Sequence, residues 1–173
     1  LSSRRQRQMC IRDSCKREPQ KTTFIDNKKP LGLQKLANLV LSQANGKYMM
    51  RLDADDWLDE NALLLLVSKL ENSSDSGLVF GNYYYTNQEG NVIGVETSFE
   101  ENVGESLSKI PPHGACTLFR TRALKTVGGY SEDVNAQDGW DLWYKLSNRI
   151  GATSIRTPAV SYTHLTLPTR AQV

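Results

Sequence analysis

The residues Tyr48-Met49-Met50-Arg51-Leu52-Asp53-Ala54-Asp55-Asp56 join a short apolar run directly to three carboxylates. A run of this kind predicts a buried strand, here ending at Asp53. Carboxylates so close together repel one another, so a cation is expected to compensate them. Oxygen ligands without His or Cys suit a hard divalent ion such as Mg²⁺ or Mn²⁺. The alternative is an acidic turn without a metal, followed by a helix that Asp59 caps.

Patterns on both sides of this stretch indicate alternating helices and strands. Helical spacing of apolar residues predicts helices over 33–44, 62–70, 123–127 and 140–146. Strand-prone runs are found at 22–25, 78–80, 83–85, 92–93 and 115–119. Alternation of this kind predicts an α/β fold with a mainly parallel sheet. In open α/β sheets, ligands bind beyond the carboxyl ends of the strands, which is where Asp53 falls.

Several short motifs follow one another along the chain. In order, they are Asp26-Asn27, Gly32-Leu33 with Asn38, 44–48, 51–56, Gly114-Ala115-Cys116, 127–130 and 137–143. Over Phe24–Leu146, their order and spacing resemble the inverting family 2 glycosyltransferases. This resemblance implies a GT-A fold, which is a Rossmann-like, mainly parallel sheet flanked by helices. It also implies metal-dependent transfer of a single sugar, with inversion, from a nucleotide-sugar donor, expected to be UDP-linked, to a glycan or lipid-linked acceptor.

The same resemblance implies a donor and metal site. Asp53 corresponds to the carboxylate near the ribose, and Asp55 to the one that binds Mn²⁺ or Mg²⁺ on the diphosphate, with Asp53 as a second metal-site residue. Lys35 and Asn38 are the further donor-binding candidates. The family often has Arg immediately before this Asn, whereas this chain has Ala37, so no phosphate contact is expected from that position.

The catalytic residues implied by the resemblance lie further along the chain. Asp138 corresponds to the base that takes the proton from the acceptor hydroxyl. It is also a candidate N-cap for the helix that follows, and the two roles are compatible. His113, Gly114 and Trp140 are candidate acceptor contacts, although a lone His is more often a surface or packed residue. We expect Asp141 to be structural.

The two ends of the chain can be encoded by one DNA segment. The codons of Asp13 back to Leu1, read on the opposite strand, can encode Val160 forward to Gln172, which is thirteen consecutive residues. The codons of residues 9–13 also resemble a transposon-end sequence used in library preparation. We therefore expect residues 1–14 and 160–173 to be translated adapter, and residues 15–159 to be a partial catalytic domain. The alternative is native basic arms that bind nucleic acid.

Removing these ends changes the charge balance. They hold five of the 21 Lys and Arg residues and one of the 19 Asp and Glu residues, so the net charge of +2 becomes −2. We therefore expect no nucleic-acid partner. Cys15, Cys116 and His113 form neither a disulfide framework nor a thiolate zinc site. The free thiols of Cys15 and Cys116 suit a reducing cytoplasmic location. If the acceptor is lipid-linked, we expect peripheral association with the inner face of the membrane.

The resemblance also predicts what this chain lacks. Family members begin with a strand, a helix and a second strand whose Asp recognises the nucleotide base, and none of these precedes Cys15. We therefore expect an internal fragment of a longer enzyme, inactive or barely active alone, with an exposed sheet edge. The absence of a Gln-x-x-Arg-Trp motif favours transfer of single sugars. Two alternatives remain: a sugar nucleotidyltransferase, and a non-catalytic module that binds divalent ions or carbohydrate.

Overall fold

The computed structural model of this 173-residue chain describes residue 13 and residues 15–53, 56–87, 90–96, 116–133 and 140–162. The chain divides into two units, Leu1–Gly32 and Leu33–Val173. In the first unit, residues 15–17 are helical, and the Thr22 hydroxyl donates hydrogen bonds to the carbonyls of Cys15 and Glu18. The predicted strand over 22–25 was wrong. Those residues have no regular structure, and Phe24 stays exposed, because strand propensity needs a packed partner surface.

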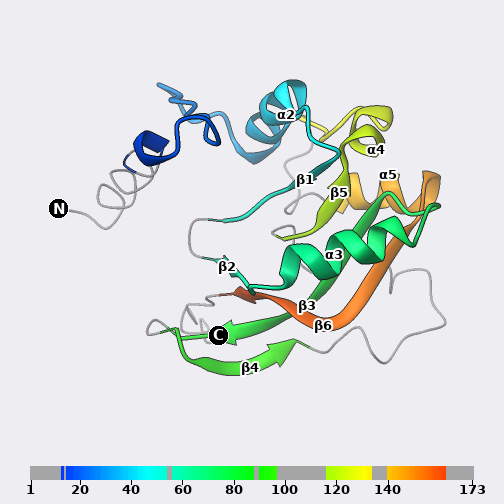
Figure 1. Cartoon of the computed structure of the whole chain (residues 1–173). Helices are drawn as coiled ribbons and strands as arrows, with labels where there is room; N and C mark the ends of the chain where they lie inside the picture. Colours follow the sequence, from blue (N-terminus) through cyan, green and yellow to red (C-terminus); the bar gives the residue numbers. More distant parts are fainter. Residues whose placement is uncertain are drawn as a thin grey trace, which may run out of the picture. The chain divides into compact units, whose positions relative to one another are not determined.

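The second unit contains the helices and strands that form the core (Figure 1). In chain order they are α2 (Leu33–Gln43), β1 (Tyr48–Met50), β2 (Trp57–Leu58), α3 (Ala62–Glu71), β3 (Leu78–Thr86), β4 (Val92–Glu96), β5 (Leu118–Arg120), α4 (Thr121–Thr126), α5 (Trp140–Arg149) and β6 (Ala152–Tyr162). The four helices predicted from apolar spacing are confirmed. The Asp59 carboxylate accepts the Asn61 amide, but Asn61 is the residue at the N-cap of α3.

The strands form one six-stranded sheet in the order β1-β5-β3-β6-β2, with β4 paired to β3. Only β3 and β6 pair in parallel, whereas the other four pairings among the described residues are antiparallel. The α/β class is confirmed, but this part of the sheet is mainly antiparallel rather than mainly parallel. One reason is the short connection from Asn87 to Asn91, since strands joined by a hairpin turn run in opposite directions.

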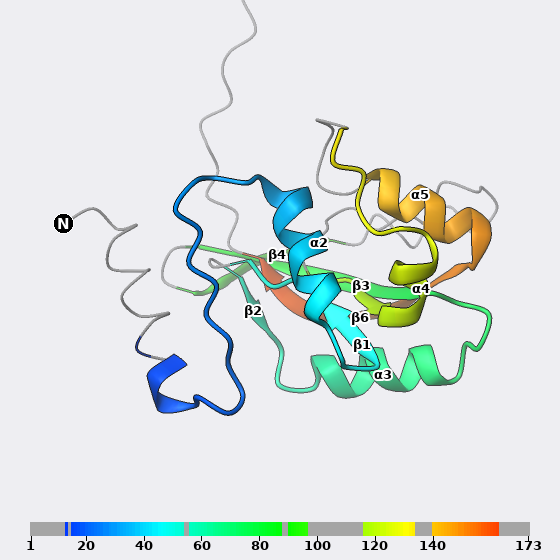
Figure 2. The same cartoon turned by 90° about the horizontal axis from the view of Figure 1, so that it is seen from above.

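Helices cover both faces of the sheet: α3 lies on one face, and α2, α4 and α5 lie on the other (Figure 2). The side chains of successive strand residues point to opposite faces of the pleated sheet. Leu78 and Phe80 of β3 join the cluster under α2, α4 and α5, whereas Val79 joins the cluster under α3. Trp143 of α5 is the largest fully buried side chain in the first of these clusters.

The strand that carries the acidic motif lies at one edge of the sheet. Among the described residues of the second unit, β1 pairs with β5 alone, in agreement with the predicted exposed edge. A hollow of about 270 Å³ borders β1 and is lined by Arg51 and by apolar residues of α2, β1 and their neighbours. Val40 of α2 and Leu52 beyond β1 remain about half exposed. The strand β6 runs through the predicted boundary at residue 159, since Val160 and Ser161 pair with β2.

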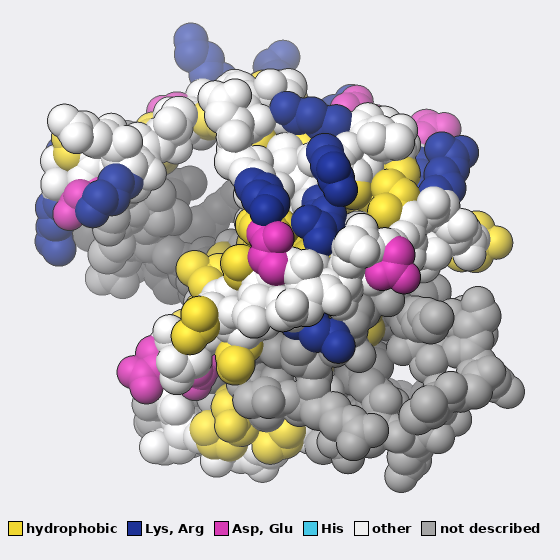
Figure 3. Space-filling model, turned by 45° about the vertical axis from the view of Figure 1, so that its right-hand side comes forward, with side chains coloured by type: hydrophobic (Ala, Val, Ile, Leu, Met, Phe, Trp, Pro, Cys, Tyr) yellow, Lys and Arg dark blue, Asp and Glu magenta, His cyan; other side chains and the backbone are white. Residues whose placement is uncertain are grey.

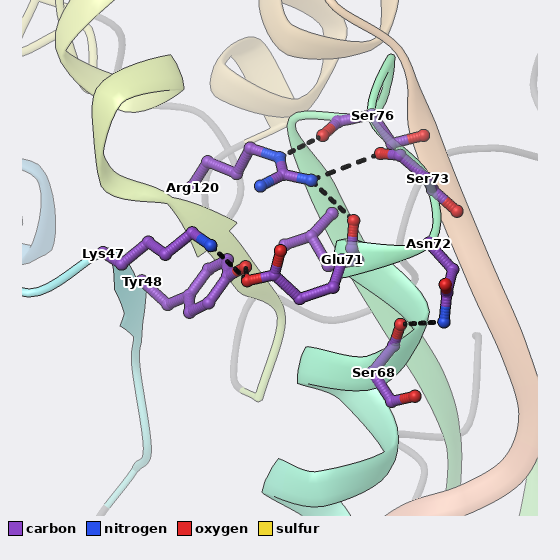
Figure 4. Close-up of polar contacts among 9 residues, drawn as sticks. Lys47, Tyr48, Ser68, Glu71, Asn72, Ser73, Ser76 and Arg120 are labelled. Carbon is purple, nitrogen blue, oxygen red and sulfur yellow. Dashed lines mark hydrogen bonds and ion pairs between the residues drawn. The ribbon is translucent and has the colours of Figure 1, made fainter.

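A buried arginine fixes the end of α3 against the sheet (Figure 4). Arg120, at the end of β5, donates from Nε to the Ser76 carbonyl (2.9 Å) and from Nη2 to the Leu70 carbonyl (2.5 Å). The Leu70 carbonyl belongs to the last turn of α3, where carbonyls lack the next helical turn as a donor, and the Ser76 carbonyl lies in the segment that leads from α3 to β3. Beside them, Glu71 accepts hydrogen bonds from Lys47 and from the Tyr48 hydroxyl. The cluster therefore ties β1, β5 and α3 together.

Candidate functional site

Asp53 lies three residues after the end of β1, on the same side of the extended chain as Arg51. The two side chains form a two-point ion pair. The Nε of Arg51 lies 2.8 Å from Oδ1 of Asp53, and its Nη2 donates to Oδ2 at 2.9 Å. The Arg51 side chain is 16% exposed and that of Asp53 is 36% exposed. The guanidinium of Arg51 therefore neutralises one carboxylate of the acidic motif, that of Asp53.

Cys116 is hydrogen-bonded to the chain just beyond the end of β1. Its backbone amide donates to the Arg51 carbonyl at 2.6 Å, and its φ of 63° lies in the left-handed region that residues other than glycine rarely adopt. Burial, helped by the nearby charges of Asp56 and Asp53 and opposed by that of Arg51, raises the pKa of the Cys116 thiol to about 12. The thiol therefore stays protonated near neutral pH.

Asp56 lies in the turn that follows Asp53. Its backbone amide donates to the Asp53 carbonyl at 3.2 Å, and both of its carboxylate oxygens are buried. Two acidic side chains thus flank residues 54 and 55, which lie outside the described residues. Within the described part of the chain, no group of three His, Cys, Asp or Glu side chains gathers where it could hold a metal ion. The oxygen donors of Asp53 and Asp56 have the chemistry that Mg²⁺ and Mn²⁺ prefer.

Asn38 of α2 holds a glycine turn that is distant in sequence. Its side-chain amide donates to the Tyr130 carbonyl and to the Glu132 carboxylate, both at 2.9 Å, and its Oδ1 accepts the Tyr130 amide at 2.9 Å. Gly129 sits under this contact with a φ of 70°, and a Cβ there would lie 2.5 Å from Asn38 Oδ1. Two of the motifs that carry the family resemblance are thus in direct contact.

A second network follows this glycine turn. Asp141 in the first turn of α5 accepts the Ser131 hydroxyl and pairs with Lys145 at 2.7 Å. Partial burial acts to raise the pKa of the Asp141 carboxyl, but the Lys145 ammonium and the Ser131 hydroxyl outweigh it, so the pKa is lowered. These contacts hold the first turn of α5 to Ser131, and the structural role of Asp141 stays a prediction. The segment 134–139, between Ser131 and α5, lies outside the described residues.

The predicted site residues divide into two groups. Lys35 is exposed near the start of α2, Asp53 lies beyond β1, and Trp140 begins α5. Asn38 is described as well, but its amide is engaged with the glycine turn. The others lie outside the described residues: Asp55, His113, Gly114 and Asp138. All of these roles therefore stay predictions.

Sequence reasoning missed two residues that shape the site, Arg51 and Gly129. Opposite charges two residues apart at a strand end were a visible signal for the Arg51–Asp53 pair, because such side chains share a face. A Gly-Gly pair ahead of Tyr130 signalled a turn, but its contact with Asn38, 92 residues earlier, had no local signal.

The surface beyond the opposite end of β1 is basic. Lys and Arg side chains gather on part of the face seen in Figure 3, with few acidic side chains among them. A pocket of about 310 Å³ there is lined by Lys47, Glu71, Ser74, Arg120 and Arg122. The contacts of Glu71 and Arg120 described above give this cluster a structural role. None of the described helices has the length and apolar character required to cross a membrane.

Solved structures share this fold. S. aureus TarS 1–349 in complex with UDP-GlcNAc matches with a TM-score of 0.67 at 14% identity, covering 88% of this chain and 45% of that chain. The mannosyltransferase PcManGT from Pyrobaculum calidifontis, in complex with GDP-Man and Mn²⁺, matches with a TM-score of 0.61 at 22% identity, covering 93% and 44%. The described architecture is therefore that of a GT-A domain, as the resemblance implied.

The sequence places the chain within a particular family. Residues 5–128 match the Glycosyl transferase family 2 domain, so the chain belongs to Glycosyl transferase family 2. This match begins inside the predicted adapter segment 1–14, whose boundary stays a prediction.

Curated relatives agree with that family. They include a chondroitin synthase from Pasteurella multocida (25% identical over 116 residues, 67% of this chain) and a poly-beta-1,6-N-acetyl-D-glucosamine synthase from Staphylococcus epidermidis (26% over 133 residues, 69%). An uncharacterized glycosyltransferase from Methanocaldococcus jannaschii is 31% identical over 128 residues, or 70% of this chain. The chain spans 12%, 32% and 43% of the lengths of these three proteins, respectively.

Proposed function

We propose that this chain is the donor-site part of a longer glycosyltransferase, which transfers a single sugar from a nucleotide-sugar donor to a glycan or lipid-linked acceptor with inversion. The observation that supports this most is the position of Asp53. It stands beyond the end of β1, beside Cys116 of a second family motif, in a chain that belongs to Glycosyl transferase family 2. A cytoplasmic location near the membrane's inner face remains part of this proposal.

The donor is proposed to bind beyond the end of β1. Asp53 accepts a hydrogen bond from a hydroxyl of the nucleotide, through the carboxylate lone pairs that Arg51 does not use. Lys35 is proposed to approach the diphosphate. The nucleotide-sugar complexes of TarS and PcManGT belong to those proteins, and they support a nucleotide-sugar donor for this fold without deciding between UDP and GDP.

The metal is proposed to be Mn²⁺ or Mg²⁺, held chiefly by Asp55 with Asp53 and Asp56 nearby. When bound, such an ion stabilises the negative charge that develops on the departing nucleoside diphosphate. The carboxylate chemistry of this turn fits a hard ion.

Asp138 is proposed to act as the base. Its carboxylate takes the proton from the acceptor hydroxyl while that oxygen bonds to the anomeric carbon and the bond to the diphosphate breaks. Attack opposite the leaving group inverts the anomeric configuration. The contacts of Asn38 with Tyr130 and of Ser131 with Asp141 fix the chain before and after the segment that contains Asp138.

Replacement of Asp138 tests this assignment in the longer enzyme. Asp138→Asn is expected to lower the transfer rate by about 10²- to 10⁴-fold, the usual contribution of a general base, and to spare donor binding. The matched control is Asp141→Asn, the same chemical change three residues away, which is expected to lower stability with a much smaller loss of rate. Loss of both transfer and donor binding in Asp138→Asn, or of neither, would contradict the proposed base.

The alternative functions give different results. A non-catalytic module that binds divalent ions or carbohydrate would bind the metal without any dependence on nucleotide, and would show no effect of Asp138→Asn. A sugar nucleotidyltransferase would release pyrophosphate from a nucleoside triphosphate and a sugar phosphate. Detection of pyrophosphate, with no sugar transferred to an acceptor, would replace the proposed function.

A further inference from the structure

The inference concerns Arg51 and rests on the proposed function. Its guanidinium holds both carboxylate oxygens of Asp53, with Nε at 2.8 Å from Oδ1 and Nη2 at 2.9 Å from Oδ2. One hydrogen bond from Nη2 and one close charge contact from Nε engage both carboxylate oxygens, which restricts rotation of the carboxylate more than a single contact would. An Asp side chain that points beyond a strand end is otherwise free to rotate about χ1 and χ2.

The surroundings of Arg51 make this contact a firm one. Its side chain is only 16% exposed, so the pair is screened by solvent less than an ordinary surface pair. Its own backbone is held as well, since its carbonyl accepts the Cys116 amide at 2.6 Å. The arginine is thus anchored through both main chain and side chain to the end of the sheet.

The pair also limits what Asp53 can bind. An ionised carboxylate has about four lone-pair positions, of which the hydrogen bond from Arg51 Nη2 occupies one, while Arg51 Nε lies beside Oδ1 as a charge contact. The remaining positions can accept neutral hydroxyl donors without moving the arginine. A divalent cation on the same carboxylate would lie within a few ångströms of the guanidinium, and like charges at that separation repel strongly.

We propose that Arg51 is a positioning residue that orients the Asp53 carboxylate toward a donor hydroxyl and keeps Asp53 out of the coordination shell of the metal. This assignment revises the prediction that Asp53 is a second metal ligand. Lysine is a poor substitute at this position, because an ammonium group is a point charge without the two-pronged geometry of a guanidinium.

The first measurement asks whether the pair exists in solution. In ¹⁵N-labelled protein, the Arg51 Nε–Hε signal should be resolved and slow to exchange in the wild type. Asp53→Asn should shift this signal and speed its exchange with water, and Arg149→Met, at the exposed end of α5, should leave it unchanged. An Arg51 signal indifferent to Asp53→Asn would overturn the inference.

The second measurement titrates Mn²⁺ alone into the 173-residue chain and follows the free ion by electron paramagnetic resonance. Arg51→Met removes a positive charge near the ion and releases Asp53 as a ligand, so Mn²⁺ should bind about three- to ten-fold more tightly. Arg51→Lys keeps the charge and should change the affinity less. Asp53→Asn removes a negative charge at a similar distance, so it should weaken Mn²⁺ binding by no more than about three- to ten-fold without abolishing it. The double variant Arg51→Met, Asp53→Asn should lose most of the gain.

The outcomes separate the inference from the proposed function. If Asp53→Asn abolishes Mn²⁺ binding, or if Arg51→Met weakens it in a folded protein, Asp53 is a metal ligand and the inference fails, while the proposed function stands. If the wild type binds no Mn²⁺ although the Arg51–Asp53 signal is intact, the proposed metal site fails instead. Should Arg51→Met not fold, Arg51→Lys and Asp53→Asn still decide between these results.

Discussion

Two adjacent glycines in the turn after α4 should differ sharply in their tolerance of alanine. Gly128 and Gly129 have φ values of 82° and 70°, so a side chain at either position carries the left-handed backbone cost of about 1–2 kcal/mol. An added Cβ at Gly128 meets nothing within 4 Å. At Gly129 it would lie 2.5 Å from Asn38 Oδ1, a separation that real structures essentially never show.

The magnitude at Gly129 follows from what must move. The Asn38 amide has to retreat, which breaks its two hydrogen bonds with the backbone of Tyr130. Each hydrogen bond contributes about 1 kcal/mol net. Gly128→Ala should therefore lower the free energy of unfolding by about 1–2 kcal/mol, and Gly129→Ala by about 3–4 kcal/mol. The reduced entropy of the unfolded chain is common to both changes and cancels in the comparison.

Urea unfolding followed by tryptophan fluorescence measures both values, because Trp143 is buried in the cluster beside this turn. A double-mutant cycle supplies the decisive control. In an Asn38→Ala background, Gly129→Ala should cost about 2 kcal/mol less than in the wild type. Equal costs at the two glycines, or a cost at Gly129 that is independent of Asn38, would refute the reasoning.

Three further predictions concern groups away from this turn. Arg120→Met should lower the free energy of unfolding by about 3 kcal/mol in a thermal melt, because it removes the buried guanidinium that donates to the Ser76 and Leu70 carbonyls. The exposed Arg122→Met should be nearly neutral in the same measurement. Cys116 should resist a thiol reagent at pH 8 in the native state and react fully in urea, measured in a variant whose other two cysteines are serine; rapid native labelling would contradict its raised pKa. Hydrogen bonds from the Lys47 ammonium, and then from the Tyr48 hydroxyl, lower the pKa of Glu71 from its ordinary value of 4.5. The ionised Glu71 therefore stabilises the fold above that value, and this contribution is lost as the pH falls through the lower folded pKa. Glu71→Gln should flatten this part of the curve of stability against pH, and a slope identical to the wild type would contradict the assignment.

The helices were predictable because their signal is local. The apolar spacing in α2, α3 and α5 reflects the face that each helix buries, and their predicted limits agree with the structure to within a few residues. The strand pairing was less accessible. Whether neighbouring strands run parallel or antiparallel depends on which segments meet in space, so the antiparallel contacts of β1 and β3 with β5 had no signal within any one segment.

The site shows the same division. Asp53 could be proposed as a site residue because a carboxylate cluster after an apolar run is visible within a few residues, and its role stays a prediction. The observed contacts of Asn38 could not be predicted in this way, since they depend on Gly129 and Tyr130 arriving from 92 residues away. The sequence predicted contact with the donor for Asn38. In the structure, its side chain instead links α2 to the turn that precedes the Asp138 segment.

The most direct test of the central claim is saturation-transfer NMR of this chain with a panel of UDP- and GDP-sugars, with and without Mg²⁺. We expect saturation transfer to the protons of at least one sugar nucleotide, dependent on Mg²⁺ and lost in Asp53→Asn, while the control Arg149→Met behaves as the wild type. Transfer to none of the sugar nucleotides, or transfer that is equal without Mg²⁺ and in Asp53→Asn, would contradict a donor site beyond the end of β1.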